Sequence, residues 1–213
     1  MASGCSNGGQ KISIYPKIGI GEKIYLNTVT IDGEYKKIDS ITVLENGKEI
    51  TFPIYSATQQ IYALSSTFND FSVFFINDKG NKTILTDFFA RTYQVKGSPA
   101  TNSLINFQHQ QAVIQEKIVQ SARINDSTTL SSLYQEYNQN YINYADTVTN
   151  PVSFVIVNDK VDFGSDYYRL EKFIRKANTK FKGDCRFDRI YSNAMDYLSG
   201  FKRSDRLNKS GAR

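Results

Sequence analysis

The spacing of apolar residues changes once along this chain, at Gly97-Ser98-Pro99, and the change divides the sequence into two kinds of structure. Before it, short segments rich in Ile, Val, Thr, Tyr and Phe alternate with turn residues, which is typical of β-strands. After it, apolar residues recur every three or four positions, which is typical of amphipathic helices. The sequence therefore predicts a β domain over residues 11–97 and a helical domain over residues 98–202.

Eight strands are expected in the first half of the chain. Their expected ranges are 11–15, 23–29, 35–44, 48–55, 59–65, 71–77, 82–88 and 92–96. Asp32-Gly33 and Asn46-Gly47 are turn sequences that suit tight hairpins. The alternation of apolar residues slips between Ile38 and Ile41, which indicates a β-bulge or a bend. An antiparallel sandwich or a partly open barrel is the economical arrangement, and together with the helices it makes an α+β fold.

Four to five helices are expected in the second half. The first begins at Ser98-Pro99, because proline suits the first turn of a helix, and Gln111 interrupts its apolar face. Asn150-Pro151 begins a short helix in the same way. Two further apolar stripes follow within residues 170–181 and 187–201.

The second helix carries an aromatic stripe with helical spacing, made of Leu130, Leu133, Tyr134, Tyr137, Tyr141, Tyr144 and Val148. Such a stripe usually packs against another helix. The alternative is an exposed surface that stacks on a carbohydrate or another ligand. Tyr137, Tyr141 and Tyr144 are the candidate binding residues under that alternative.

The reactive side chains argue against catalysis by this chain alone. Cys5 and Cys185 lie far apart and neither belongs to a Cys-x-x-Cys pair, which argues against a dithiol redox motif and a four-cysteine zinc site. The single histidine, His109, lies in a Gln-rich helical stretch, whereas Ser-His and Cys-His catalysis needs an imidazole beside a nucleophile. No glycine-rich phosphate loop is present. We therefore expect no catalytic residue, no metal site and no cofactor.

The basic character of the chain is concentrated at its end. The net charge is +5, of which residues 1–201 supply +1 (21 basic against 20 acidic residues) and residues 202–213 supply +4 (five against one). Residues 203–213 are therefore expected to form a basic polar tail, and no nucleic-acid partner is expected, because basic residues are not interleaved with aromatics elsewhere.

The amino terminus has the pattern Ala2-Ser3-Gly4-Cys5 followed by polar residues. Small residues leading into a cysteine resemble a bacterial lipoprotein processing site, in which Cys5 is modified by lipid. Residues 1–10 are expected to form a flexible terminus of this lipoprotein type, and the alternative is an accidental exposed thiol in a disordered terminus. No run approaches the ~20 apolar residues of a membrane helix. The expected location is the cell envelope, on the periplasmic side of a membrane, with the lipid on Cys5 as the anchor.

Several segments resemble a known family. Residues 37–43 (Lys-Ile-Asp-Ser-Ile-Thr-Val), Asn46-Gly47 and Ile50-Thr51-Phe52 are similar to the amino-terminal β domain of exported TlpA-like thiol:disulfide oxidoreductases. Residues 96–102 and 149–154 are similar to the helical segment that follows it. The resemblance covers residues 10–202. In that family a thioredoxin-fold domain with Cys-x-x-Cys normally follows, and this sequence contains none, so no position inherits a catalytic role.

The resemblance implies a noncatalytic accessory or binding module of the cell envelope. Its implied partner is a thioredoxin-like domain or another envelope protein. Two alternatives stay open: a subunit that recruits a separate thioredoxin-like enzyme, and a lipoprotein that binds a carbohydrate or a peptide through an exposed edge strand or the tyrosine stripe.

Overall fold

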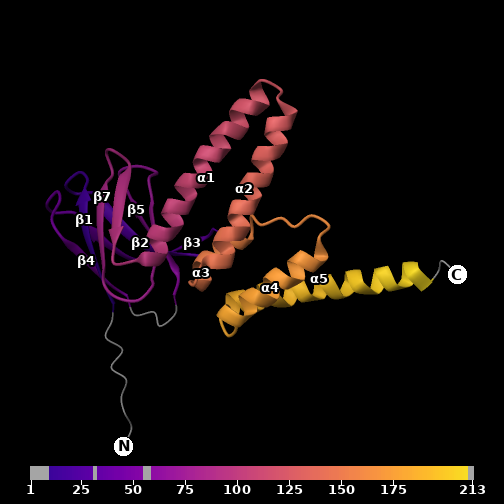
Figure 1. Ribbon diagram of the computed structural model, residues 1–213. Helices are drawn as coiled ribbons and strands as arrows, with labels where there is room; N and C mark the ends of the chain where they lie inside the picture. Colours follow the sequence, from indigo (N-terminus) through magenta and orange to yellow (C-terminus); the bar gives the residue numbers. More distant parts are fainter. Residues whose placement is uncertain (1–9, 31–32, 55–58, 211–213) are drawn as a thin grey trace, which may run out of the picture. The chain divides into compact units, whose positions relative to one another are not determined.

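The structure, a computed structural model, describes residues 10–30, 33–54 and 59–210, with the backbone alone for residues 202–210. Cys5 and its proposed lipid lie outside the described residues. Within the described residues, eight strands are followed by five helices (Figure 1). The predicted α+β fold is confirmed, and the strands form two open four-stranded sheets, not a closed barrel.

The eight strands divide equally between two sheets. Sheet A has the order β4-β1-β7-β8, with β1 (Gln10–Lys17), β4 (Ile50–Ile54), β7 (Lys82–Asp87) and β8 (Thr92–Lys96). Sheet B has the order β3-β2-β5-β6, with β2 (Lys23–Val29), β3 (Tyr35–Thr42), β5 (Ile61–Ser66) and β6 (Val73–Ile76). One pairing departs from the antiparallel expectation, because β1 and β7 are parallel. Parallel neighbours need a long connection, and here the chain between them supplies the whole of sheet B and β4.

The predicted bulge lies in β3. Leu26 pairs with Asp39 and Asn27 pairs with Lys37, so Ile38 is the extra residue on β3. Ile41 packs against the interior of the β domain, whereas Ile38 is half exposed.

The core of the β domain lies between the two sheets. Alternate residues of each strand point inward, which makes a cluster of fifteen buried side chains that includes Ile12, Ile14, Leu26 and Phe75. The same alternation places Tyr15 and Lys17 of β1 on the outer face of sheet A.

The helices are α1 (Pro99–Arg123), α2 (Ser127–Thr147), α3 (Pro151–Asn158), α4 (Tyr167–Phe181) and α5 (Cys185–Ser210). The chain divides into two compact units between Asn106 and Phe107, inside α1, whereas the sequence placed the domain boundary at residue 98. The reason is that the first turn of α1 is bonded to the β domain. Ser98 Oγ donates to the carbonyl oxygen of Ile76 (3.1 Å), and Thr101 Oγ1 accepts from the Ile76 amide (2.8 Å).

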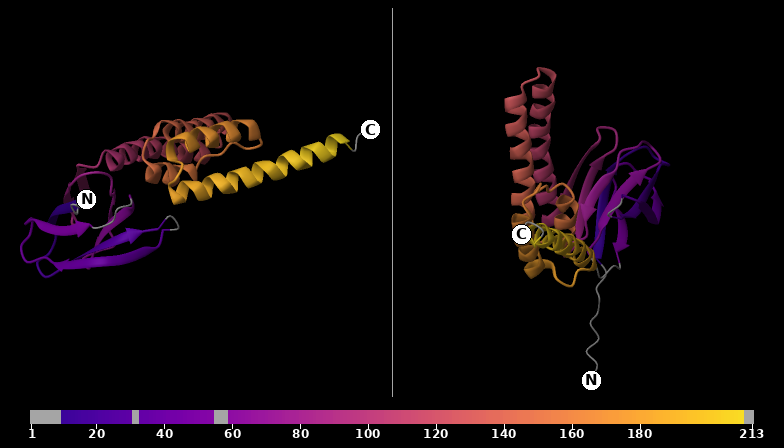
Figure 2. Two further views of the ribbon diagram at one scale, coloured as in Figure 1. Left: turned by 90° about the horizontal axis from the view of Figure 1, so that it is seen from below. Right: turned by 90° about the vertical axis from the view of Figure 1, so that its right-hand side faces the viewer.

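The second unit begins with a helical hairpin, in which α1 from Phe107 onward lies beside α2 (Figure 1, Figure 2). Ile114, Ile118 and Leu133 pack together within it. Asn150 caps α3 by accepting from the amides of Val152 and Ser153, as Asn150-Pro151 predicted.

The rest of the second unit is centred on α3. The ring centroid of Phe154 lies 5.0–5.8 Å from the ring centroids of Phe173, Phe181 and Phe187. α5 continues to Ser210, so residues 203–210 of the predicted basic polar tail are helical. No glycine or proline interrupts residues 202–210, and lysine, arginine and leucine are good helix formers.

Candidate functional site

The outer face of sheet A carries two rows of side chains that run across three neighbouring strands. In the first row, Tyr15 of β1 is paired with Leu85 of β7, and Leu85 with Gln94 of β8. In the second row, Lys17 is paired with Asp87, and Asp87 with Thr92. Paired residues on one face of a sheet are close neighbours, so residues distant in the sequence form one continuous surface.

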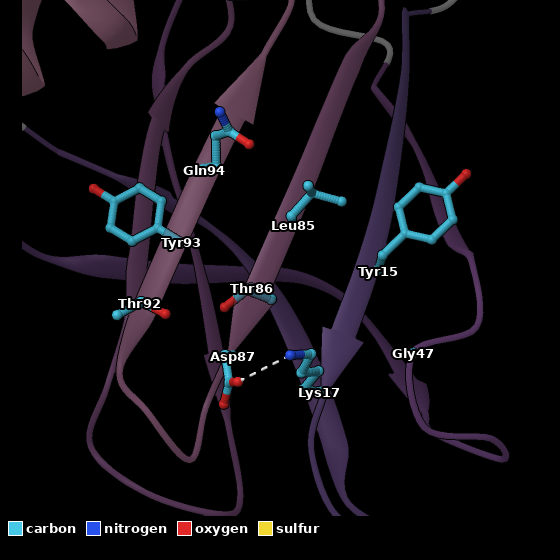
Figure 3. Close-up of a pocket in the computed structure, with 9 residues that line it drawn as sticks. All are labelled: Tyr15, Lys17, Gly47, Leu85, Thr86, Asp87, Thr92, Tyr93 and Gln94. Carbon is cyan, nitrogen blue, oxygen red and sulfur yellow. Dashed lines mark ion pairs between the residues drawn. The ribbon is translucent and has the colours of Figure 1, made fainter.

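These six residues, with Gly47, Thr86 and Tyr93, line an open depression of about 450 Å³ (Figure 3). Tyr15 lies on one side of it and Gln94 on the other, with Leu85 between them. Leu85 is 37% exposed, so the floor between the two polar side chains is apolar and open to solvent.

Asp87 is a fixed, ionised acceptor at one end of the depression. Its Oδ1 accepts from the amides of Ala90 (2.9 Å) and Phe89 (3.1 Å), and its Oδ2 lies 3.5 Å from Lys17 Nζ. The bond from the Ala90 amide and the neighbouring Lys17 lower the pKa of Asp87. Burial raises the pKa of Tyr93, which keeps its phenol neutral.

The depression therefore combines two tyrosine rings, one aliphatic side chain, an amide, two threonine hydroxyls and an ion pair. The rings and Leu85 offer apolar contact, whereas the amide and the threonine hydroxyls donate and accept hydrogen bonds. This set of groups can hold a neutral ligand that has both an apolar face and hydroxyl groups.

A second polar cluster lies at the start of α1 but is closed to solvent. The Lys82 side chain is fully buried, and its Nζ donates to the carbonyl oxygens of Asp78 and Gly80 (2.6 Å to the latter) and lies 3.2 Å from Asp78 Oδ1. Asp78 Oδ2 accepts from the Ala100 amide in the first turn of α1 (3.0 Å). Burial lowers the pKa of Lys82, and the charge of Asp78 opposes that shift. The cluster joins the β6–β7 turn to α1 and has a structural role.

Neither cluster is recognisable in the sequence. Lys82 occupies the first position of an ordinary amphipathic strand, where a lysine is normally exposed. Tyr15, Leu85 and Gln94 come from three strands, and nothing in the sequence shows that those strands are neighbours.

The predicted binding residues Tyr137, Tyr141 and Tyr144 are half-buried in the helical hairpin. Tyr144 stacks on Phe107 (4.2 Å between ring centroids), and Tyr141 meets the same ring edge-on (5.0 Å). Tyr137 lies 5.0 Å from Tyr141. The structure thus brings the three together as hairpin packing, and their role in binding a ligand stays a prediction.

The residues considered for catalysis lie apart from one another. His109 and Cys185 are both exposed, the first on α1 and the second at the start of α5. Arg186, beside Cys185, is paired with Asp184 (2.5 Å).

Across the described ranges, no group of three or more His, Cys, Asp or Glu side chains is placed to hold a metal ion. Among the described helices, none has the length and hydrophobicity to cross a bilayer.

No protein-family model matches this sequence, and no curated protein matches it. The resemblance to TlpA-like proteins therefore rests on the motifs quoted above.

Replacing Gln111 with leucine is expected to stabilise the helical unit by about 1–2 kcal/mol, because an amide buried without partners is costly. Gln111 is 3% exposed in the hairpin, and both polar atoms of its side chain lack a hydrogen-bond partner within the described part of the chain. Urea unfolding followed by circular dichroism measures the change. Gln110→Leu, at an exposed position of the same helix, is the control and should shift the midpoint little. A loss of stability in Gln111→Leu would show that the amide is satisfied in solution.

Proposed function

We propose that this chain is a noncatalytic binding module of the cell envelope, and that the outer face of sheet A binds a neutral carbohydrate. The observation that carries the proposal is the row of Tyr15, Leu85 and Gln94 across three strands, beside the Lys17–Asp87 pair. A sugar ring has an apolar face that stacks on an aromatic side chain, and its hydroxyl groups need donors and acceptors around the rim. The depression supplies both on a rigid sheet, so little entropy is lost on binding.

The envelope location in this proposal comes from the sequence. Lipidation of Cys5 would attach the module to a membrane, and the similarity to TlpA-like proteins adds a thioredoxin-like protein as a proposed partner. The β domain would then hold a glycan or a glycan-bearing partner near that protein.

Replacing Tyr15 with alanine is expected to weaken carbohydrate binding at least ~10-fold, since the loss of one stacked ring removes roughly 1.4 kcal/mol of binding free energy. Isothermal titration with a panel of neutral hexasaccharides (linked glucose, xylose, mannose and N-acetylglucosamine) measures the affinity. Gln94→Ala should weaken the same ligand by a smaller factor.

Tyr25→Ala is the matched control, because Tyr25 is a half-buried tyrosine of sheet B that lies under Lys37 (4.3 Å from Nζ to the ring centroid). It should leave the affinity unchanged. The carbohydrate proposal fails if none of the hexasaccharides binds, or if Tyr15→Ala and Tyr25→Ala weaken binding equally.

A further inference from the structure

The four loops at one end of the β sandwich each present a large apolar side chain to solvent. These loops join β1 to β2, β3 to β4, β5 to β6 and β7 to β8, and they share the end of the sandwich opposite the start of β1 (Figure 1). The exposed fractions are 73% for Ile20, 83% for Leu44, 39% for Phe68 and 58% for Phe89, one residue from each loop. We call this surface the four-loop end.

Hydrogen bonds tie the four loops to one another and to the end of β1. The bonds are Gly21 N to Val43 O (2.9 Å), Lys23 N to Thr67 Oγ1 (2.9 Å), Asn69 Nδ2 to Phe88 O (2.7 Å), Phe88 N to Lys17 O (2.9 Å) and Gly47 N to Pro16 O (2.7 Å). The rings of Phe68 and Phe89 also touch, with centroids 4.8 Å apart. The apolar side chains are therefore held on a braced backbone, and little backbone order remains to be gained when they bind a surface.

The charges around the four-loop end are balanced. Four basic and five acidic residues lie in or beside the loops, at positions 17, 23, 48 and 91 and at positions 22, 45, 49, 70 and 87, and the fifth acidic residue, Glu49, is paired with Lys11 of β1 (3.1 Å). Six of them form three ion pairs: Lys17–Asp87 (3.5 Å), Lys48–Glu45 (2.7 Å) and Arg91–Asp70 (2.9 Å). Because these pairs leave the four-loop end without net charge, it suits a binding partner whose surface also carries no net charge.

The form of the apolar surface favours a lipid bilayer over a protein. Ile20 and Leu44, the two most exposed of the four, are aliphatic and stand on separate loops. Energetically important residues of protein interfaces are instead enriched in Trp, Tyr and Arg and cluster in one desolvated patch. Separate apolar side chains at loop tips can each enter the boundary between headgroups and acyl chains, where the burial of apolar area drives binding.

We propose that the four-loop end docks on a bilayer of neutral, zwitterionic lipids by inserting Ile20, Leu44, Phe68 and Phe89. β1 begins at the opposite end of the sandwich, so this contact is distinct from any attachment through Cys5. It also does not depend on carbohydrate binding by sheet A.

The test uses the full chain carrying Cys5→Ser, so that no lipid is attached, and cosedimentation with phosphatidylcholine vesicles. Leu44→Ser/Phe89→Ser is expected to partition at least ~10-fold less than the parent, because both side chains contribute apolar area to the insertion. Ile124→Ser is the matched control, since Ile124 is 74% exposed at the end of α1, and it should partition like the parent. Unchanged far-ultraviolet circular dichroism establishes that the variants are folded.

Three outcomes would overturn the proposal. The first is no binding of the parent to phosphatidylcholine vesicles. The second is binding to phosphatidylglycerol vesicles alone, which would assign the contact to basic residues. The third is a dimer in sedimentation velocity that Leu44→Ser/Phe89→Ser abolishes while vesicle binding is unchanged, which would assign the four-loop end to a second copy of the chain.

Discussion

Replacing Gly97 with alanine is expected to destabilise the β domain by about 3–5 kcal/mol. Gly97 has a φ of 81°, where a side chain costs roughly 1–2 kcal/mol of strain. A Cβ at this position would also lie 2.3 Å from the carbonyl oxygen of Asn81, which is a backbone atom. The chain cannot relieve that overlap with a rotamer change, so the backbone of the β6–β7 turn must move.

The β6–β7 turn is held in place at Asn81 from two sides, which is why the expected loss of stability is large. Asn81 Oδ1 accepts from the Lys11 amide (3.0 Å), and the next residue, Lys82, is the buried cation. Movement of Asn81 therefore disturbs both β1 and the ion pair under α1.

Urea unfolding followed by circular dichroism measures the loss, and Gly21→Ala separates its two causes. Gly21 has a φ of 91°, and no atom lies within 4 Å of a Cβ built there, so this variant experiences the strain without the overlap. It should lose only about 1–2 kcal/mol. Equal losses in the two variants would show that the approach of Gly97 to Asn81 is not a tight constraint.

Replacing Asp78 with asparagine is expected to destabilise the β domain by about 3–5 kcal/mol, because it leaves the cation of Lys82 buried without its counterion. Lys82 has no exposed side-chain surface, and Asp78 Oδ1 lies 3.2 Å from its Nζ. The same substitution removes a negative charge from the first turn of α1, where Asp78 Oδ2 accepts from the Ala100 amide. Equilibrium unfolding in urea measures the effect.

A double variant distinguishes the loss of pairing from general damage to the turn. Asp78→Asn/Lys82→Met removes both charges, and it should recover at least ~1 kcal/mol relative to Asp78→Asn alone, because no unpaired ion is left in the interior. Asp70→Asn breaks the exposed Arg91–Asp70 pair and should leave the unfolding midpoint unchanged. If the double variant is less stable than Asp78→Asn, the lysine contributes through its bonds to the two carbonyl oxygens more than through its charge.

Much of the fold could be predicted because its signals are local. The slip in alternation between Ile38 and Ile41 marked the bulge, since each residue of a strand must face one side or the other. Asn150-Pro151 marked the start of α3, because an asparagine side chain caps free amides and proline lacks one. Each of these features is decided by a few neighbouring residues.

The candidate site could not be predicted in the same way. Tyr15 and Leu85 lie 70 positions apart in the sequence, and they meet because β1 and β7 are parallel neighbours. Hairpin signals indicate only antiparallel pairing between consecutive strands, so this pairing leaves no local trace. The tyrosine stripe of α2, which the sequence singled out, packs against Phe107 because the hairpin brings α1 beside it.

By itself, the sequence determined the type of the elements and the change from strands to helices near residue 98, because periodicity, caps and turns act over a few residues. Only the tertiary structure decided which strands became neighbours, and with that the depression on sheet A, the four-loop end and the burial of Lys82. The physical reason is that these surfaces are made by contacts between residues far apart in the chain, whose energies depend on distance in space and leave no pattern in the order of the residues.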